Sequence, residues 1–194
     1  MPLSTPVPRQ PHHTRTIECR GYLRDDGLWD IEGHLVDTKP YPVPTDDRMV
    51  PAGQPLHEMW IRLTVDLDLV VHGVEAVTDW GPYDGCAAIA PAFAQLKGLS
   101  IKSGWTLATR ELLGGVRGCT HLVELLGPVA TTAFQTVYAA RERARPAGSD
   151  GRRPGLIDSC HMYAVSGPIV QRRWPTFHIA AAPVEPVDNP AGPG

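Results

Sequence analysis

The chain has no long hydrophobic run. None of its apolar stretches approaches the roughly 20 residues that cross a bilayer, and residues 1–13 lack the apolar centre of a secretory signal. We therefore expect a cytoplasmic protein that has no membrane as a partner.

An excess of basic charge is also missing. The net charge is -3, the isoelectric point lies near 6.2, and the arginines are scattered rather than gathered on one predicted face. A phosphate backbone needs a positive field to hold it. Nucleic acid is therefore excluded as an expected partner.

Cysteine is too scarce for a disulfide scaffold. In a reducing compartment, free cysteines are buried small hydrophobes, metal ligands or nucleophiles. The four cysteines are Cys19, Cys86, Cys119 and Cys160. Burial is the default interpretation for each of them.

The ends of the chain are rich in proline and poor in apolar residues, so ordering them would cost more entropy than burial returns. We expect loose tails at residues 1–13 and 183–194, and a single α+β domain over residues 14–182. Its length is sufficient for one hydrophobic core. The sequence leaves the oligomeric state open.

Alternation of polar and apolar residues predicts an antiparallel sheet. Residues 15–37 contain two alternating runs around Asp26-Gly27, which is typical of a β-hairpin. Residues 38–56 carry five prolines and predict a loop. Residues 59–69 alternate most clearly, and a further strand is expected near residues 72–80.

Helical spacing follows the strands. Helices are predicted over residues 87–96 and 105–113, with Ser103 as the N-cap of the second. Apolar residues between 122 and 137 recur at three and four positions, but Gly127-Pro128 interrupts them and predicts a kink or two abutting helices. A linker over residues 141–154 and a final hairpin over residues 159–174 complete the expected fold.

Cys86 and Cys119 are each expected near the start of a helix. Exposed amides and the helix dipole stabilise a thiolate there, which is the form that binds metal or attacks an electrophile. His57, just before the long strand, joins them if that strand end lies alongside. His121 and Glu124 are weaker candidates, because Cys119 and His121 would point about 200° apart within one helix. Both could bind one ion only if the helix starts after Cys119.

The chain resembles a bacterial family of domains without an assigned function. The signature that carries this resemblance is Gly-Cys-Thr-His-Leu-Val-Glu-Leu-Leu at residues 118–126, supported by segments 29–35, 37–39, 62–64, 96–99, 104–105 and 132–135. This resemblance implies no chemistry.

Residues 56–135 also resemble iron-sulfur cluster scaffold proteins of the NifU/IscU type, through a Gly-Cys turn at Cys86 and a Cys-x-x-Leu-x-Glu pattern from Cys119. The resemblance implies a NifU/IscU-like core, a small antiparallel sheet with helices on one face, to which the two hairpins are added. It also implies a site at one end, where His57 takes the place of the family's first cysteine.

One histidine and two thiolates suit zinc or mononuclear iron better than an iron-sulfur cluster. We therefore expect a metal site of His57, Cys86 and Cys119, open to a small-molecule substrate.

Two alternatives remain. One is a metal-independent enzyme that uses Cys119 or His121 as nucleophile or general acid and base, in a pocket lined by Trp29, Tyr83 and Trp105. The other is a non-catalytic binding or interaction module with buried structural cysteines. Whether the chain is an enzyme is left open.

Overall fold

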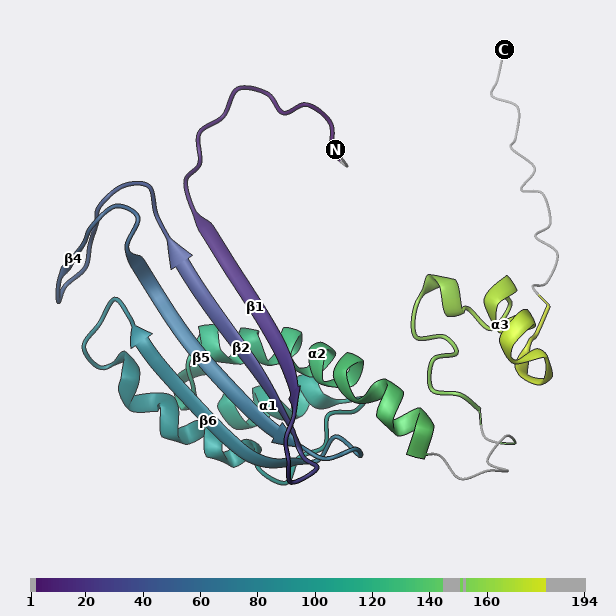
Figure 1. Cartoon of the computed structure of the whole chain (residues 1–194). Coiled ribbons are helices and arrows are strands. Elements are labelled where there is room, and N and C mark those ends of the chain that lie inside the picture. The colour runs from purple at the N-terminus through teal and green to yellow at the C-terminus, as the bar shows by residue number, and fades with distance from the viewer. Residues whose placement is uncertain (1–2, 145–150, 152, 181–194) are drawn as a thin grey trace, which may run out of the picture. The chain divides into compact units, whose positions relative to one another are not determined.

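The computed structural model describes residues 3–144, 151 and 153–180, and the expected tail at residues 183–194 lies outside them. Its contacts divide the chain into two compact units, residues 1–144 and 145–194. The first unit carries a sheet and the helices that cover it (Figure 1).

The sheet has four antiparallel strands in the order β1-β2-β5-β6. The strands are β1 (Thr14–Leu23), β2 (Trp29–Thr38), β5 (Pro55–Val65) and β6 (Val71–Trp80). The predicted α+β class and the N-terminal hairpin are confirmed. Gly27, in the hairpin turn, has a φ of 83°, a conformation that glycine adopts without steric cost.

The proline-rich segment between β2 and β5 was predicted as a loop. It contains one short antiparallel pair, β3 (Val43–Pro44) and β4 (Met49–Val50). The rest of the segment has neither helix nor strand, as its proline content indicates.

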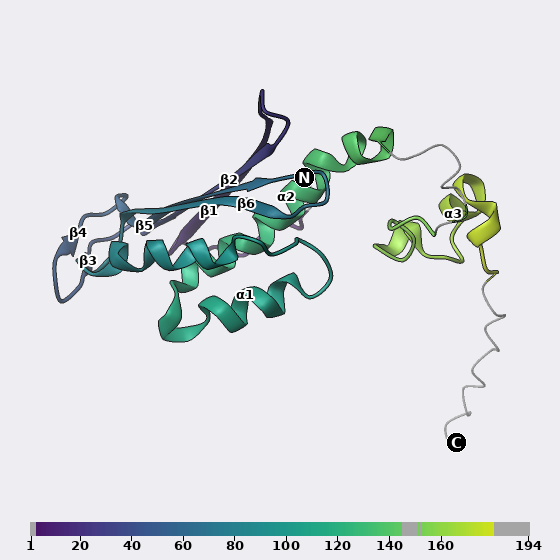
Figure 2. The ribbon, with the colours of Figure 1, turned by 90° about the horizontal axis from the view of Figure 1, so that it is seen from below.

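Helices cover one face of the sheet (Figure 2). They are the 3-10 helix η1 (Cys86–Leu96), α1 (Trp105–Leu113), the short η2 (Gly115–Arg117) and α2 (Thr120–Ala144). The predicted helix over residues 105–113 matches α1, although Gly104 takes the N-cap position in place of Ser103. Pro128 lies inside α2, which continues as one helix through part of the expected linker.

The core lies between the covered face of the sheet and the helices, including α2. Alternate residues of β2 and β5 point into it, as do the apolar positions of α2. Gly33 allows α2 to approach β2 closely, since a Cβ at this position would lie 2.5 Å from a methyl carbon of Val129. Gly21 does the same on β1, where the nearest side chain is that of Thr136. The glycines at positions 21 and 33 therefore allow α2 to pack close to the sheet.

In the second unit, the described residues form short helices. These are η4 (His161–Tyr163), α3 (Pro168–Arg173) and η5 (Pro175–Phe177). The prediction of a hairpin over residues 159–174 is wrong. Gly167-Pro168 starts a helix, since a proline in the first turn needs no hydrogen-bond donor.

Candidate functional site

Three side chains form a row across β1, β2 and β5 at one end of the covered face. Asp37 is paired with Arg15 on one neighbouring strand and with His57 on the other. Asp37 lies two residues beyond the buried Leu35, and His57 lies two residues before the buried Met59. Each therefore extends the core-facing stripe of its strand with a polar group.

Helix α2 adds His121 to this row. The helix begins at Thr120, so Cys119 lies outside it, which is the condition under which Cys119 and His121 can face the same site. The rings of His57 and His121 stack with their centroids 3.7 Å apart. The Nδ1 atom of His121 lies 3.9 Å from the Cys119 sulfur.

Asp37 is the centre of the cluster, and only 1% of its side chain is exposed. Arg15 donates to both carboxylate oxygens at 2.8 Å, and His13 lies 3.1 Å from Oδ1. Oδ2 is 3.1 Å from Nδ1 of His57 and 3.8 Å from Nε2 of His121. Buried carboxylates are rare unless they are paired or ligate a metal, and Asp37 has cationic or polar partners on both oxygens.

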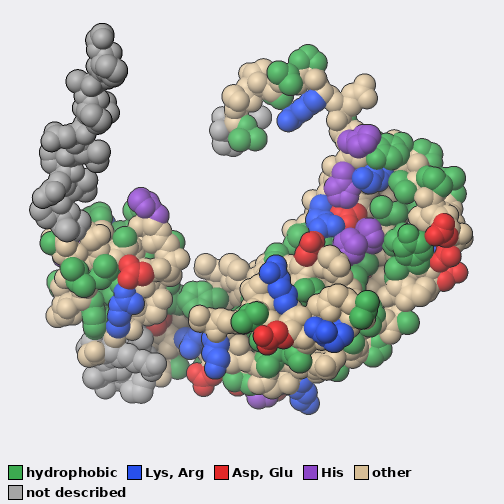
Figure 3. Space-filling model, turned by 180° about the vertical axis from the view of Figure 1, so that it is seen from behind, with side chains coloured by type: hydrophobic (Ala, Val, Ile, Leu, Met, Phe, Trp, Pro, Cys, Tyr) green, Lys and Arg blue, Asp and Glu red, His purple; other side chains and the backbone are tan. Residues whose placement is uncertain are grey.

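Arg15 links this carboxylate to the surface. Its Nη1 atom donates to Glu124 of α2 at 2.5 Å, so one guanidinium holds Asp37 and Glu124 at once. Figure 3 shows histidine side chains beside positive and negative ones where the N-terminal segment meets the sheet.

The surroundings change the protonation of the site. Burial lowers the pKa of His57 to about 4, and the nearby His121 adds to this effect while Asp37 opposes it. Burial also lowers the pKa of His121. Burial acts to raise the pKa of Asp37, but the hydrogen bonds and charge of Arg15 outweigh it and hold that pKa below its usual range. Neutral imidazoles beside an ionised carboxylate are the protonation states that bind metal.

Among the described residues, Asp37, His57 and His121 each offer a ligand atom, and these atoms all lie within 4.8 Å of one another. Ligands about 2.0–2.2 Å from one zinc or iron ion are separated by roughly 3–3.5 Å. The observed spacing of up to 4.8 Å is roughly 1–2 Å wider, so the side chains would have to move together around an ion. Arg15 would hold the carboxylate in place, as outer-sphere partners of metal ligands do.

The structure brings together only part of the expected ligand set. His57 belongs to the group of Asp37, His57 and His121. Cys119 lies beside the group, because its sulfur is 3.9 Å from Nδ1 of His121. Cys86 is the first residue of η1, which follows β6. Its sulfur packs against Gly81, where an added Cβ would lie only 2.9 Å away. Neither cysteine belongs to the group of three ligand atoms.

Sequence reasoning missed Asp37, Arg15 and His13. The sequence did indicate Asp37, because it lies an even number of residues from Ile31 and Leu35. In a strand with alternating burial it therefore points to the same face, toward the core. His13 had no such signal, since it lies outside any regular pattern.

The chain belongs to the family described as "Protein of unknown function (DUF2889)", whose model matches residues 13–135. The matched region contains every member of the cluster, from His13 to Glu124. No curated protein and no solved structure matches the chain. The NifU/IscU resemblance is thus not shown by any comparison.

No helix in the described part of the chain is long and apolar enough to cross a membrane.

Proposed function

We propose that the chain binds one transition-metal ion, zinc or iron, through Asp37, His57 and His121. The observation that supports it is the convergence of three ligand atoms within 4.8 Å from three separate segments. Two histidines and one carboxylate suit zinc or non-haem iron(II), and they leave coordination positions open for water or a small substrate. Thiolates are the usual ligands of iron-sulfur clusters, so this ligand set disfavours a cluster.

Arg15 shapes the properties of such a site. Its charge weakens attraction for a cation, yet it leaves lone pairs of the Asp37 carboxylate available and fixes their direction. Glu124 offsets part of that charge. The balance favours a moderately held ion with an accessible face over a closed structural site.

The metal proposal is tested on protein stripped of metal and titrated with zinc or, without oxygen, with iron(II). Wild type should bind one equivalent. His57→Ala/His121→Ala should lose more affinity than the roughly 10–100-fold that outer-sphere changes cost. His34→Ala is the matched control, since His34 also contacts a carboxylate and stacks on a ring, but on the opposite face of the sheet. Equal binding by the double variant and wild type contradicts the proposal.

The cysteines are tested separately. The earlier ligand set of His57, Cys86 and Cys119 stays a prediction, and Cys86→Ala/Cys119→Ala distinguishes it from the set above. Loss of metal in this variant favours the cysteine set. Retention of metal favours Asp37, His57 and His121.

A second candidate function is a metal-independent cysteine enzyme. His121 lies between the Cys119 sulfur, 3.9 Å from Nδ1, and Asp37 Oδ2, 3.8 Å from Nε2. This is the order of nucleophile, base and orienting carboxylate in catalytic triads. Fast alkylation of Cys119 in metal-free protein, slowed by His121→Gln, supports it, and slow alkylation in both proteins contradicts it.

The likeness to NifU/IscU scaffolds remains a proposal about fold. It is supported by Cys86 at the start of η1 after β6 and by Cys119 directly before α2.

A further inference from the structure

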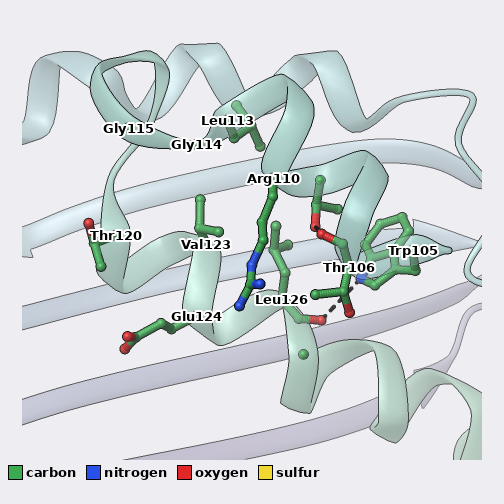
Figure 4. Close-up of a pocket in the computed structure, with 12 residues that line it drawn as sticks. Trp105, Thr106, Arg110, Leu113, Gly114, Gly115, Thr120, Val123, Glu124 and Leu126 are labelled. Carbon is green, nitrogen blue, oxygen red and sulfur yellow. Dashed lines mark hydrogen bonds between the residues drawn. The ribbon is translucent and has the colours of Figure 1, made fainter.

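Helices α1 and α2 border a groove of about 520 Å³ (Figure 4). Small-molecule sites in proteins commonly measure about 300–1,000 Å³. Trp105, which was expected to line a pocket, borders this groove, whereas Trp29 and Tyr83 are not among its lining residues. The groove is therefore large enough for a small organic molecule.

The walls of the groove are largely apolar. Trp105, Leu113 and Leu126 line it, and each is almost completely buried. The indole N–H of Trp105 donates to the backbone oxygen of Leu126 at 3.4 Å, so the polar atom of this ring is satisfied within the protein. Val123, which also lines the groove, is only half-buried and offers apolar surface to a ligand.

The two charged residues of the groove differ in their partners. Glu124 is engaged by Arg15 at 2.5 Å. Arg110 extends from α1 toward α2 in Figure 4, and its guanidinium makes no hydrogen bond or ion pair with any residue that the structure describes. Other arginines of this unit, such as Arg24 and Arg62, are held by carboxylates. The groove therefore contains one uncommitted positive charge beside apolar walls.

We propose that this groove binds a small organic anion, with a carboxylate or phosphate group on Arg110 and an apolar body against Val123 and the small exposed part of Trp105. A guanidinium donates two parallel hydrogen bonds to either group, which both orients and holds it. The walls remove the apolar part of the ligand from water.

The groove and the Asp37 cluster share the first turns of α2. Thr120, Val123 and Glu124 line the groove, and His121 joins the cluster. The anion site nevertheless stands without a metal, because none of the atoms that define it belongs to the cluster of ligand atoms. Its test can be carried out on metal-free protein, so its failure is distinct from failure of the metal site.

The test follows backbone amide resonances of isotope-labelled, metal-free protein during titration with phenylacetate and with phenyl phosphate. Saturable shifts should map to α1 and the first turns of α2. The neutral isostere phenylacetamide should bind at least about tenfold more weakly, since hydrogen bonds to a charged group account for this difference. The relative affinities of the two anions show whether the site prefers carboxylate or phosphate.

Variants of Arg110 complete the test. Arg110→Gln should weaken both anions at least about tenfold, and Arg110→Lys should lose less, since it keeps the charge without the planar fork. Arg20→Gln, on the open face of the sheet, makes the same change in net charge and should leave binding unchanged. Equal binding of phenylacetamide, unchanged binding in Arg110→Gln, or shifts that map elsewhere would overturn the proposal.

Discussion

The two faces of the sheet carry similar rows of charged side chains that differ in what covers them. On the open face, Arg62 is paired across the strands with Glu32 and Glu75, and its guanidinium contacts both. On the covered face, Asp37 stands between Arg15 and His57. Both rows alternate positive or polar groups with carboxylates across three neighbouring strands.

The faces also share a histidine–carboxylate pair with a stacked ring. His34 contacts Glu58 at 3.0 Å and stacks on Trp60, while His57 contacts Asp37 at 3.1 Å and stacks on His121. The carboxylates differ most, because Glu58 is 23% exposed and Asp37 is 1% exposed. Water reaches the Glu58 carboxylate, whereas the protein must supply nearly all the polar partners of the Asp37 carboxylate. A histidine–carboxylate pair thus forms a surface pair on one face and part of a buried cluster on the other.

The largest expected difference between the faces is in the pH dependence of stability. The folded pKa of His57, about 4, lies below the ordinary 6.5. Between these two values the unfolded chain binds more protons, so stability falls as the pH falls through this window, by up to about 3 kcal/mol. Urea unfolding of metal-free protein at both ends of the window measures this.

The histidine variants show which face is responsible. His57→Gln should show a smaller loss of stability on acidification than wild type. His34→Gln should behave like wild type. The same loss in all three proteins would contradict the assignment to His57.

Removal of the buried carboxylate should cost nearly as much. Asp37→Ala leaves Arg15 with Glu124 as its remaining carboxylate partner, and because Arg15 is also 32% exposed we expect a loss of about 2–3 kcal/mol, below the full cost of breaking a buried pair. Glu58→Ala should cost less than about 1 kcal/mol. Denaturant unfolding near neutral pH compares the two, and equal losses would remove the distinction between the faces.

The close approach of α2 to the covered face predicts a smaller effect. Gly33→Ala places a methyl group against Val129 and Leu125 and should cost about 1–3 kcal/mol through overpacking. Gly85→Ala is the control, since its φ is -78° and no atom lies within 4 Å of the added carbon. Thermal unfolding checks both, and an unchanged melting temperature in Gly33→Ala would show that α2 moves freely.

The smallest effect is expected on the open face. Arg62→Gln removes two exposed ion pairs and should cost less than about 1 kcal/mol at low salt, with the difference vanishing as added salt screens the charges. The measurement is unfolding at low and high ionic strength. A loss that persists at high salt would show that this row is more than a surface pair.

The spacing of apolar residues and the residues typical of turns were sufficient to predict the four long strands, the helix over residues 105–113 and the hairpin at Gly27. The C-terminal hairpin was wrong because short alternating runs there are broken by Gly167-Pro168, which starts a helix instead. Pro128 was overestimated as a breaker, since packing of α2 on the sheet outweighs one missing hydrogen bond.

The site was only partly predictable. His57 and His121 were both candidates, but their proximity depended on whether the start of the strand lies alongside the start of the helix, as it does in the structure. Asp37 depends on the pairing of β2 with β5, which are joined by a proline-rich segment. Strand order across such a segment is a tertiary property that local pattern does not specify.

The row of Arg15, Asp37 and His57 also has a consequence for folding kinetics. A slip of β2 by one residue would turn Asp37 to the open face and separate its carboxylate from His57 and His121. Formation of the cluster therefore requires correct register of three strands and docking of α2. Binding of the proposed metal during refolding would then report that these long-range pairings are complete.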